Sequence, residues 1–262
     1  MTGSTNEFIR VERHDGVLTI TMDRAPVNAF NGKMHSELAR VLRDLPNDRE
    51  TRVVVLAGNG KHFCAGGDLA WFAELRVMDK YAAVLQETCD MIEGILNAPQ
   101  PVIAMVTGSA VGLGASLALC CDIVYAAENA RFSDPHVQIG LVPGDGGAAL
   151  WPLLIGPARA KELLLTGEAV AAPEAARIGL ISRAFPAEQL RDAVMGLAAR
   201  LAQSPPLAVR WTKNAVNQGI KAVAMQVFAT AAGFEGMTFL SEDCREATAA
   251  MMEKRKPVFK GR

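Results

Sequence analysis

Two glycine-rich turns are the segments of this sequence best suited to hold a reacting carbonyl group. Residues 61–69 (KHFCAGGDL) follow the apolar run 53–56, and residues 108–116 (GSAVGLGAS) lie between an apolar run and an apolar helical segment. Glycine lets a backbone adopt positive φ and approach a ligand closely, and the first N–H groups of a helix point outward with partial positive charge. One N–H from each turn, aimed at one point, would form an oxyanion hole. Alternatively, both turns are only tight connections between strands and helices.

Neither turn has a phosphate-binding pattern. The first is not GxxxxGK[ST], and the second is not GxGxxG. A P-loop and a dinucleotide fingerprint are therefore not supported.

Three polar residues in and after the second turn are candidates for proton transfer. Ser116 lies three residues after Leu113, on the same helix face. His136, in the segment SDPH, has an unperturbed pKa near 6.5, which suits a base or an acid near neutral pH. Asp145 lies in the flexible turn PGDGG, which is expected to face the same region. The alternatives are a turn-capping or backbone-bonding role for His136 and a turn-stabilising role for Asp145.

The same three residues could also form a Ser-His-Asp triad in a thioester hydrolase. Against this, Ser116 is expected one turn inside a helix, whereas a nucleophile elbow places its serine at the strained turn before the helix.

The predicted elements alternate between strands and helices, which indicates an α/β fold with parallel strand pairs. We expect strands at 7–13, 16–22, 53–56, 101–106, 122–126 and near 181–183. We expect helices from Asn31 to Leu42, from Lys80 to Leu96, after the second glycine-rich turn, and over most of the chain from Pro157. The segment 204–252 reads as nearly all helical, with breaks at Gly219, Gly233 and Gly236.

Composition excludes several classes of protein. The 262 residues are 50% apolar and 21% charged with a net charge of -1, which excludes wholesale disorder and a broad basic surface for nucleic acid or a membrane. The uncharged stretch 94–121 contains Pro99, Pro101 and several glycines, so a buried strand, turn and helix explain it better than a membrane span. Five cysteines without CxxC spacing and an N-terminus without a signal-like pattern predict a cytoplasmic protein without a zinc site.

Taken together, these segments resemble the crotonase, or enoyl-CoA hydratase/isomerase, superfamily over essentially the whole chain. The resemblance rests on residues 17–24 with Asn28-Ala29, 63–69, 108–114 leading to 121–123, 140–147, 158–167, Ser241-Glu242-Asp243, Glu246 and 256–262.

The resemblance implies a crotonase-like spiral of ββα units over residues 1–200 and a C-terminal helical region over 201–262 that forms a homotrimer or a dimer of trimers. It implies an acyl-CoA thioester as ligand, as in fatty acid metabolism, and no separate cofactor or metal. The thioester oxygen would bind the N–H groups of Gly67 and Leu113, which would stabilise an enolate. The implied coenzyme A contacts are Ala25, Val27, Ala65, Asp68 and Leu69, with Phe259 and Lys260 of a neighbouring subunit.

The sequence departs from the family at the residues that transfer protons. The two glutamates of family hydratases correspond here to Ser116 and His136, and the isomerases often keep only the second, which is also missing. Some members use an aspartate in the later loop, where the matching position is Gly144. The expected reaction is therefore a hydratase or isomerase reaction with His136 or Asp145 transferring protons and Ser116 assisting. The alternatives are an isomerase or thioester hydrolase acting on an unusual acyl-CoA, and a non-catalytic acyl-CoA-binding protein.

The acyl pocket is expected to form from residues 71–81 and the C-terminal helices. Its candidate lining residues, each of which could instead be core, are Trp71, Phe72, Met78 and Trp151. No catalytic role is expected for the remaining histidines and the paired cysteines, which are His14, His35, His62, Cys120 and Cys121.

Overall fold

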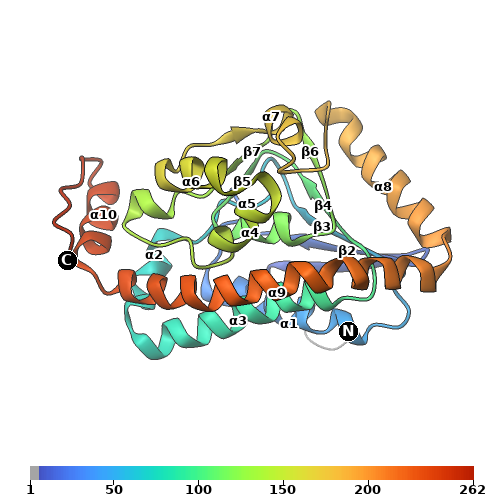
Figure 1. The fold of residues 1–262 in the computed structure, drawn as a ribbon, viewed down its shortest axis with the longest axis horizontal. Coiled ribbons are helices and arrows are strands. Elements are labelled where there is room, and N and C mark those ends of the chain that lie inside the picture. Colours follow the sequence, from blue (N-terminus) through green and yellow to red (C-terminus); the bar gives the residue numbers. More distant parts are fainter. Residues whose placement is uncertain (1–5) are drawn as a thin grey trace.

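The computed structural model describes residues 6–262, with Leu69 described by its backbone only. Its centre is a six-stranded sheet in the order β1-β2-β3-β4-β6-β9 (Figure 1). The strands are β1 (Ile9–His14), β2 (Val17–Met22), β3 (Val53–Gly58), β4 (Val102–Val106), β6 (Ile123–Ala127) and β9 (Arg183–Phe185). Only β1 and β2 pair antiparallel; the other neighbours are parallel. The predicted α/β fold is confirmed.

Local sequence explains the first elements. Asp15 and Gly16 have φ of 48° and 77°, the geometry of a tight hairpin turn between β1 and β2. Asn31 caps α1 (Gly32–Arg43) by accepting a hydrogen bond from the Met34 N–H at 2.9 Å, as predicted.

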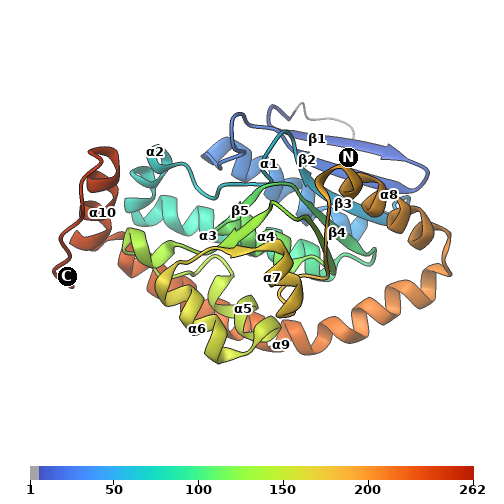
Figure 2. The same cartoon turned by 90° about the horizontal axis from the view of Figure 1, so that it is seen from above.

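Both faces of the main sheet are covered, which explains the continuous apolar run of β3. Val53 and Val55 pack with α8 (Ala187–Gln203), while Val54 and Leu56 belong to the larger core on the other face. That core lies beneath α1, α3 (Met78–Asn97) and α4 (Leu113–Cys120). In Figure 2, α8 and α9 lie on different sides of the molecule.

A second, three-stranded sheet was not predicted because its strands are only two or three residues long. It consists of β5 (Ser109–Val111), β7 (Arg131–Ser133) and β8 (Val170–Ala171). Strand β5 lies within the second glycine-rich turn, and β7 leads into the segment that carries His136. The remaining helices are α2 (Leu69–Phe72), α5 (Gly147–Ile155), α6 (Pro157–Thr166), α7 (Ala172–Arg177), α9 (Pro206–Phe239) and α10 (Glu242–Met252).

The predicted helix breaks in the C-terminal region are wrong. The helix α9 runs unbroken through Gly219, Gly233 and Gly236, because one internal glycine costs only about 1 kcal/mol and packing compensates for it. It spans the length of the molecule, and α10 turns away from its end (Figure 1). No single helix among residues 6–262 is long and apolar enough to span a membrane; α9 and α10 meet the length and composition limits only as a pair, bent by 68°.

Candidate active site

The two glycine-rich turns lie against each other. The N–H groups of Phe63 and Cys64 donate to the Ser109 carbonyl at 3.1 and 3.0 Å, and the Val111 N–H donates to the Cys64 carbonyl at 3.0 Å. A Cβ at Gly114 would lie 2.6 Å from the Cys64 carbonyl oxygen. Only glycine therefore permits this approach of α4 to the first turn.

The turns leave two N–H groups available at one cavity. The Phe30 N–H donates to the Gly66 carbonyl, and the Phe30 carbonyl accepts from the Asp68 N–H. The N–H of Gly67, which lies between these two residues, has no acceptor among residues 6–262. Leu113 is the first residue of α4, and its N–H is likewise without an acceptor within the described chain. Both residues line a cavity of about 270 Å³.

Most of the cavity wall is apolar. Its apolar side chains are Trp71, Phe72, Leu75, Val84, Leu85, Ile139 and Phe239. Polar groups gather at two places: His35 and Thr88 in one part of the wall, and His136, Asp145 and Glu235 in another. His35 is buried and bonds Glu87 at 2.6 Å and Thr88 at 3.1 Å, so it lines the cavity with both ring nitrogens already in use.

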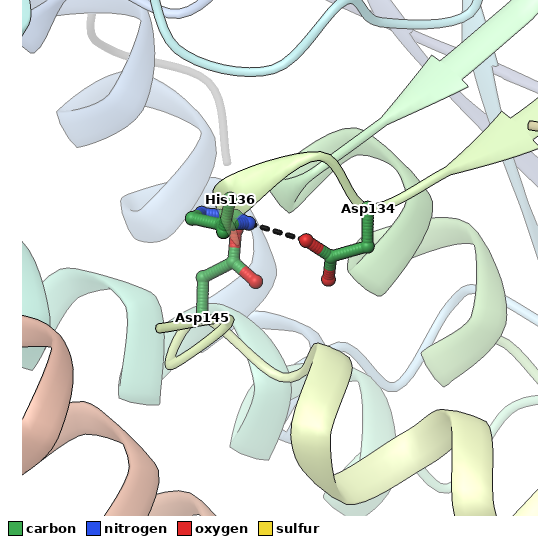
Figure 3. Close-up of side chains that lie close together, drawn as sticks. All are labelled: Asp134, His136 and Asp145. Carbon is green, nitrogen blue, oxygen red and sulfur yellow. Dashed lines mark hydrogen bonds and ion pairs between the residues drawn. The ribbon is translucent and has the colours of Figure 1, made fainter. Parts of the chain in front are cut away.

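His136 is held by Asp134. Its Nδ1 is hydrogen-bonded to Asp134 Oδ1 (Figure 3), and both residues are buried. The backbone between them turns at Pro135, and His136 begins the 3-10 turn His136–Ile139. Its ring therefore does not cap that turn, and Nε2 is left facing Asp145 and Glu235 at 3.5 Å each.

Asp145 is positioned by Ser116. The Ser116 hydroxyl donates to Asp145 Oδ1 at 3.0 Å, and Oδ2 faces His136. Ser116 is completely buried and does not line the cavity. In a hydrolase triad the histidine lies between serine and aspartate. Here the aspartate lies between the other two, so the serine has no histidine beside it to take its proton, and the geometry does not make it a nucleophile.

Glu235 enters the site from α9. One oxygen, Oε2, lies 3.2 Å from the Tyr81 hydroxyl, which also donates to the Ala232 carbonyl at 2.6 Å; the other, Oε1, faces His136. Glu235 is buried. The site thus places three carboxyl groups around one imidazole.

The crowding of acids shifts the pKa values of His136, Asp145 and Glu235. Burial alone would lower the pKa of His136, but Asp134 and Asp145 outweigh it and raise that pKa well above 6.5. Burial raises the pKa of Asp145 to about 6 and that of Glu235 to about 8, although His136 acts in the opposite direction on both. His136 therefore favours its imidazolium form, and both carboxyl groups hold their protons to a higher pH than free carboxyl groups do.

Asp134, His136 and Asp145 offer ligand atoms within 4.8 Å of one another, the spacing of a metal site. However, Nδ1 of His136 is bonded to Asp134, and Asp145 is bonded to Ser116. The hydrogen bonds and the protonated imidazole fit an acid–base cluster better than a set of metal ligands.

The residues expected to contact coenzyme A are spread over the surface near the first turn and the C-terminus. Ala65 lines the cavity, Val27 is half-buried and Ala25 is exposed. Asp68 caps α2 and pairs with Arg24 at 2.9 Å, and Leu69 begins that helix. Phe259 and Lys260 are exposed and do not line the cavity; their tail folds against α10, where the Lys260 N–H donates to Asp243 at 2.7 Å.

Among the other candidates, Trp71 and Phe72 line the cavity. Trp151 is fully buried elsewhere in the core, and Met78 is half-exposed. His62 accepts a hydrogen bond from the Ser109 N–H at 3.3 Å and so joins the two turns. Cys120 and Cys121 are buried, and burial raises the pKa of both thiols.

The sequence analysis missed Asp134, Tyr81 and Glu235. A signal for Glu235 was present, since it is the one charged residue in the span 222–240. A lone charge in an apolar helix is either exposed or specifically used. Nothing local connects it to His136, 99 residues earlier in the chain.

Comparisons with known proteins identify the family of this chain. Residues 12–262 match the model of the enoyl-CoA hydratase/isomerase family. The chain is 35% identical over 257 residues to a crotonyl-CoA hydratase of Syntrophomonas wolfei, covering 97% of each protein.

Two solved structures are also similar. One is an enoyl-CoA hydratase/isomerase from Mycobacterium paratuberculosis, with a TM-score of 0.89, 35% identity and coverage of 92% of this chain and 97% of that one. The other is a β-diketone hydrolase from the cyanobacterium Anabaena bound to (S)-3-oxocyclohexyl acetic acid, with a TM-score of 0.84, 30% identity and coverage of 89% and 94%. The chain therefore belongs to the enoyl-CoA hydratase/isomerase family and has the crotonase fold.

Proposed function

We propose that this protein binds an acyl-CoA thioester with its carbonyl oxygen between the N–H groups of Gly67 and Leu113, and that it stabilises the enolate formed there. The observation that carries the proposal is that these two N–H groups have no acceptor among the described residues and that Gly67 and Leu113 line the same cavity as His136, Asp145 and Glu235. A preorganised donor of this kind contributes about 3–4 kcal/mol to stabilising a developing oxyanion.

Asp145 is the base in this proposal. The Ser116 hydroxyl donates to one of its oxygens, which favours its ionised form, while the other oxygen faces His136. The His136 imidazolium supplies positive charge and a hydrogen-bond donor to the developing anion. The raised pKa of His136 favours this role over that of a general base.

Addition of water to a 2-enoyl-CoA is the reaction that such a site serves best. Asp145 takes a proton from water while the water oxygen bonds to the β-carbon, and the electrons of the double bond move into the thioester as an enolate. The apolar wall around Trp71 and Phe72 favours an apolar acyl group. Ala25, Val27, Ala65, Asp68 and Leu69 remain the proposed contacts for the rest of coenzyme A.

Assembly into a trimer or a dimer of trimers is part of the proposal. Its support is the set of large apolar side chains that are exposed on α9 in the single chain, which are Leu207, Trp211, Val216, Val223, Phe234 and Met237. In that assembly Phe259 and Lys260 would reach the coenzyme A of a neighbouring subunit.

Cleavage of a β-diketone is the second candidate. It is favoured by the similarity to the β-diketone hydrolase and by the absence of glutamate at positions 116 and 136. Water would add to one ketone, the bond from that carbonyl carbon to the central carbon would break, and its electron pair would form the enolate of the other ketone. The same oxyanion hole would hold that enolate.

One pair of assays separates these candidates. We expect the wild-type protein to consume crotonyl-CoA, followed as loss of the conjugated-thioester absorbance, and Asp145→Asn to lower the rate at least about 100-fold. Glu188→Gln, an exposed carboxyl on α8, is the matched control. Cleavage of a cyclic 1,3-diketone with no loss of crotonyl-CoA would instead establish the second candidate. Binding of acyl-CoA without turnover of either compound would identify a non-catalytic binding protein.

A further inference from the structure

Glu235 is a buried carboxyl group with few polar partners among the described residues. It is the only charged residue in the span 222–240 and is 7% exposed. Burying a carboxyl group without strong partners costs free energy, and an apolar side chain of similar length would avoid that cost. Retention of a glutamate here therefore favours a chemical role.

Two glycines make the space that Glu235 and Tyr81 occupy. A Cβ at Gly144 would lie 2.6 Å from Glu235 Cβ and 2.7 Å from its Oε2. A Cβ at Gly236 would lie 2.7 Å from the Tyr81 ring. Real Cβ contacts are longer than this, so the carboxyl group from α9 fills the volume that a side chain at position 144 would otherwise occupy.

The contacts of this carboxyl group favour its neutral form. The Tyr81 hydroxyl has one hydrogen, and its shorter contact is with the Ala232 carbonyl at 2.6 Å, so Glu235 at 3.2 Å receives little from it. Asp134 and Asp145 are nearby anions, and the only cation that residues 6–262 place against the carboxyl group is His136, at 3.5 Å. A carboxyl group placed in this way holds a proton and presents it to the cavity it lines.

We propose that Glu235 is the acid that delivers a proton to the α-carbon of the enolate held at Gly67 and Leu113, an assignment that rests on the function proposed above. The enolate electron pair forms the new C–H bond, the Glu235 O–H bond breaks, and Glu235 is left as a carboxylate beside the His136 imidazolium. Asp145 holds the proton taken from water. His136 Nε2 lies 3.5 Å from both acids, so one proton passed through it returns both to their starting states.

The two acids are distinguished by their surroundings. Ser116 donates to Asp145 and stabilises its ionised form, whereas Glu235 has no comparably short hydrogen bond. Burial raises the pKa of both groups, and the hydrogen bond from Ser116 opposes that rise at Asp145, as the role of a base requires.

The test is exchange of the α-hydrogens of butyryl-CoA, a saturated thioester, in D₂O. By microscopic reversibility, the group that protonates the α-carbon also removes its proton. We expect the wild-type protein to incorporate deuterium, Glu235→Gln to do so at least 100-fold more slowly, and butyryl-CoA affinity to change less than threefold. Glu188→Gln should exchange at the wild-type rate.

The pH profile separates a catalytic role from a structural one. Removal of a proton needs the carboxylate form, so the wild-type exchange rate should rise as pH rises through the raised pKa of Glu235. That rise should be absent in Glu235→Gln. Glu235→Met, apolar and of similar length, provides a second variant if the glutamine variant does not fold.

The outcomes distinguish the two proposals. Binding and exchange by the wild-type protein, with equally fast exchange by Glu235→Gln, would overturn the role of Glu235 and leave the proposed function standing. Failure of the wild-type protein to bind or exchange butyryl-CoA would overturn both.

Discussion

The helix α9 buries two charged side chains, Lys213 near its start and Glu235 near its end, and their surroundings differ sharply. Lys213 Nζ donates to the carbonyls of Ile95 and Gln100 at 2.9 and 3.0 Å and pairs with Asp122 at 2.7 Å. All three ammonium hydrogens therefore have partners. Glu235 has one hydrogen bond of 3.2 Å and a histidine at 3.5 Å.

The difference shows that burial of an ionisable side chain does not by itself indicate whether its role is structural or chemical. A buried charge with complete partners anchors one element to another, here α9 to the residues around β4. A buried charge with loose partners is costly in the resting state, and that cost is offset when a ligand or a transferred proton supplies the missing interaction. Completeness of partners, rather than depth, separates the structural residue from the chemical one.

The largest expected effect on stability is that of Lys213→Met. It leaves Asp122 unpaired and two buried carbonyls without a donor, and should lower the free energy of unfolding by about 3–5 kcal/mol. Urea denaturation, with exposed Lys161→Met as control, measures it. The folded variant should keep its turnover within threefold; a loss below 1 kcal/mol would contradict the anchoring role.

A smaller effect is expected in the pH dependence of stability. Glu235 and His136 both have raised pKa values, so the folded protein holds more protons than the unfolded chain above about pH 4.5, the ordinary value for glutamate. Stability from these groups is therefore present at low pH and is lost as pH rises toward their folded-state pKa values. Between pH 5 and pH 8 the free energy of unfolding of the wild-type protein should fall by on the order of 1–2 kcal/mol more than that of Glu235→Met. Denaturation curves at each pH measure this difference. If the free energies of unfolding of the two proteins changed in parallel with pH, the pKa of Glu235 would not be raised in the folded state.

The smallest expected effect is a gain. Replacing an incompletely paired buried acid by an apolar side chain should stabilise the fold, so Glu235→Met should raise the free energy of unfolding by about 1 kcal/mol and Tm by roughly 2–4 °C. A calorimetric scan at pH 7 would detect the shift. A lower Tm would mean that Glu235, like Lys213, is part of the framework.

The sequence predicts the features that are determined by residues close together in the chain. The two turns, the hairpin, the cap at Asn31 and the segments carrying His136 and Asp145 are each determined within about ten residues, and the structure has them where they were expected. The resemblance to the crotonase superfamily, which the family match confirms, provided the fold.

What the sequence did not reveal depends on distance along the chain. Glu235 meets His136 only because α9 passes the catalytic turns, and Asp134 is distinguished from other aspartates only by the direction in which its side chain points. Ser116 was expected to face the ligand beside Leu113, but its hydroxyl instead supports Asp145 from behind. The pKa of His136 follows from three acids brought together by folding, so an unperturbed value could not anticipate it.

Glu235 fills the volume beside Gly144, so positions 144 and 235, which are 91 residues apart, cannot be changed independently. Any side chain at 144 collides with Glu235, and a small residue at 235 would free the volume for an acid at 144. Moving the acidic group from α9 to the loop therefore requires substitutions at both positions. An acid introduced at 144 alone would collide with Glu235, and a small residue at 235 alone would remove the acid and leave a cavity. In a sequence alignment, Gly144 alone would suggest that an acidic group is missing from the site. In the structure, Glu235 places a carboxyl group in the same volume from α9.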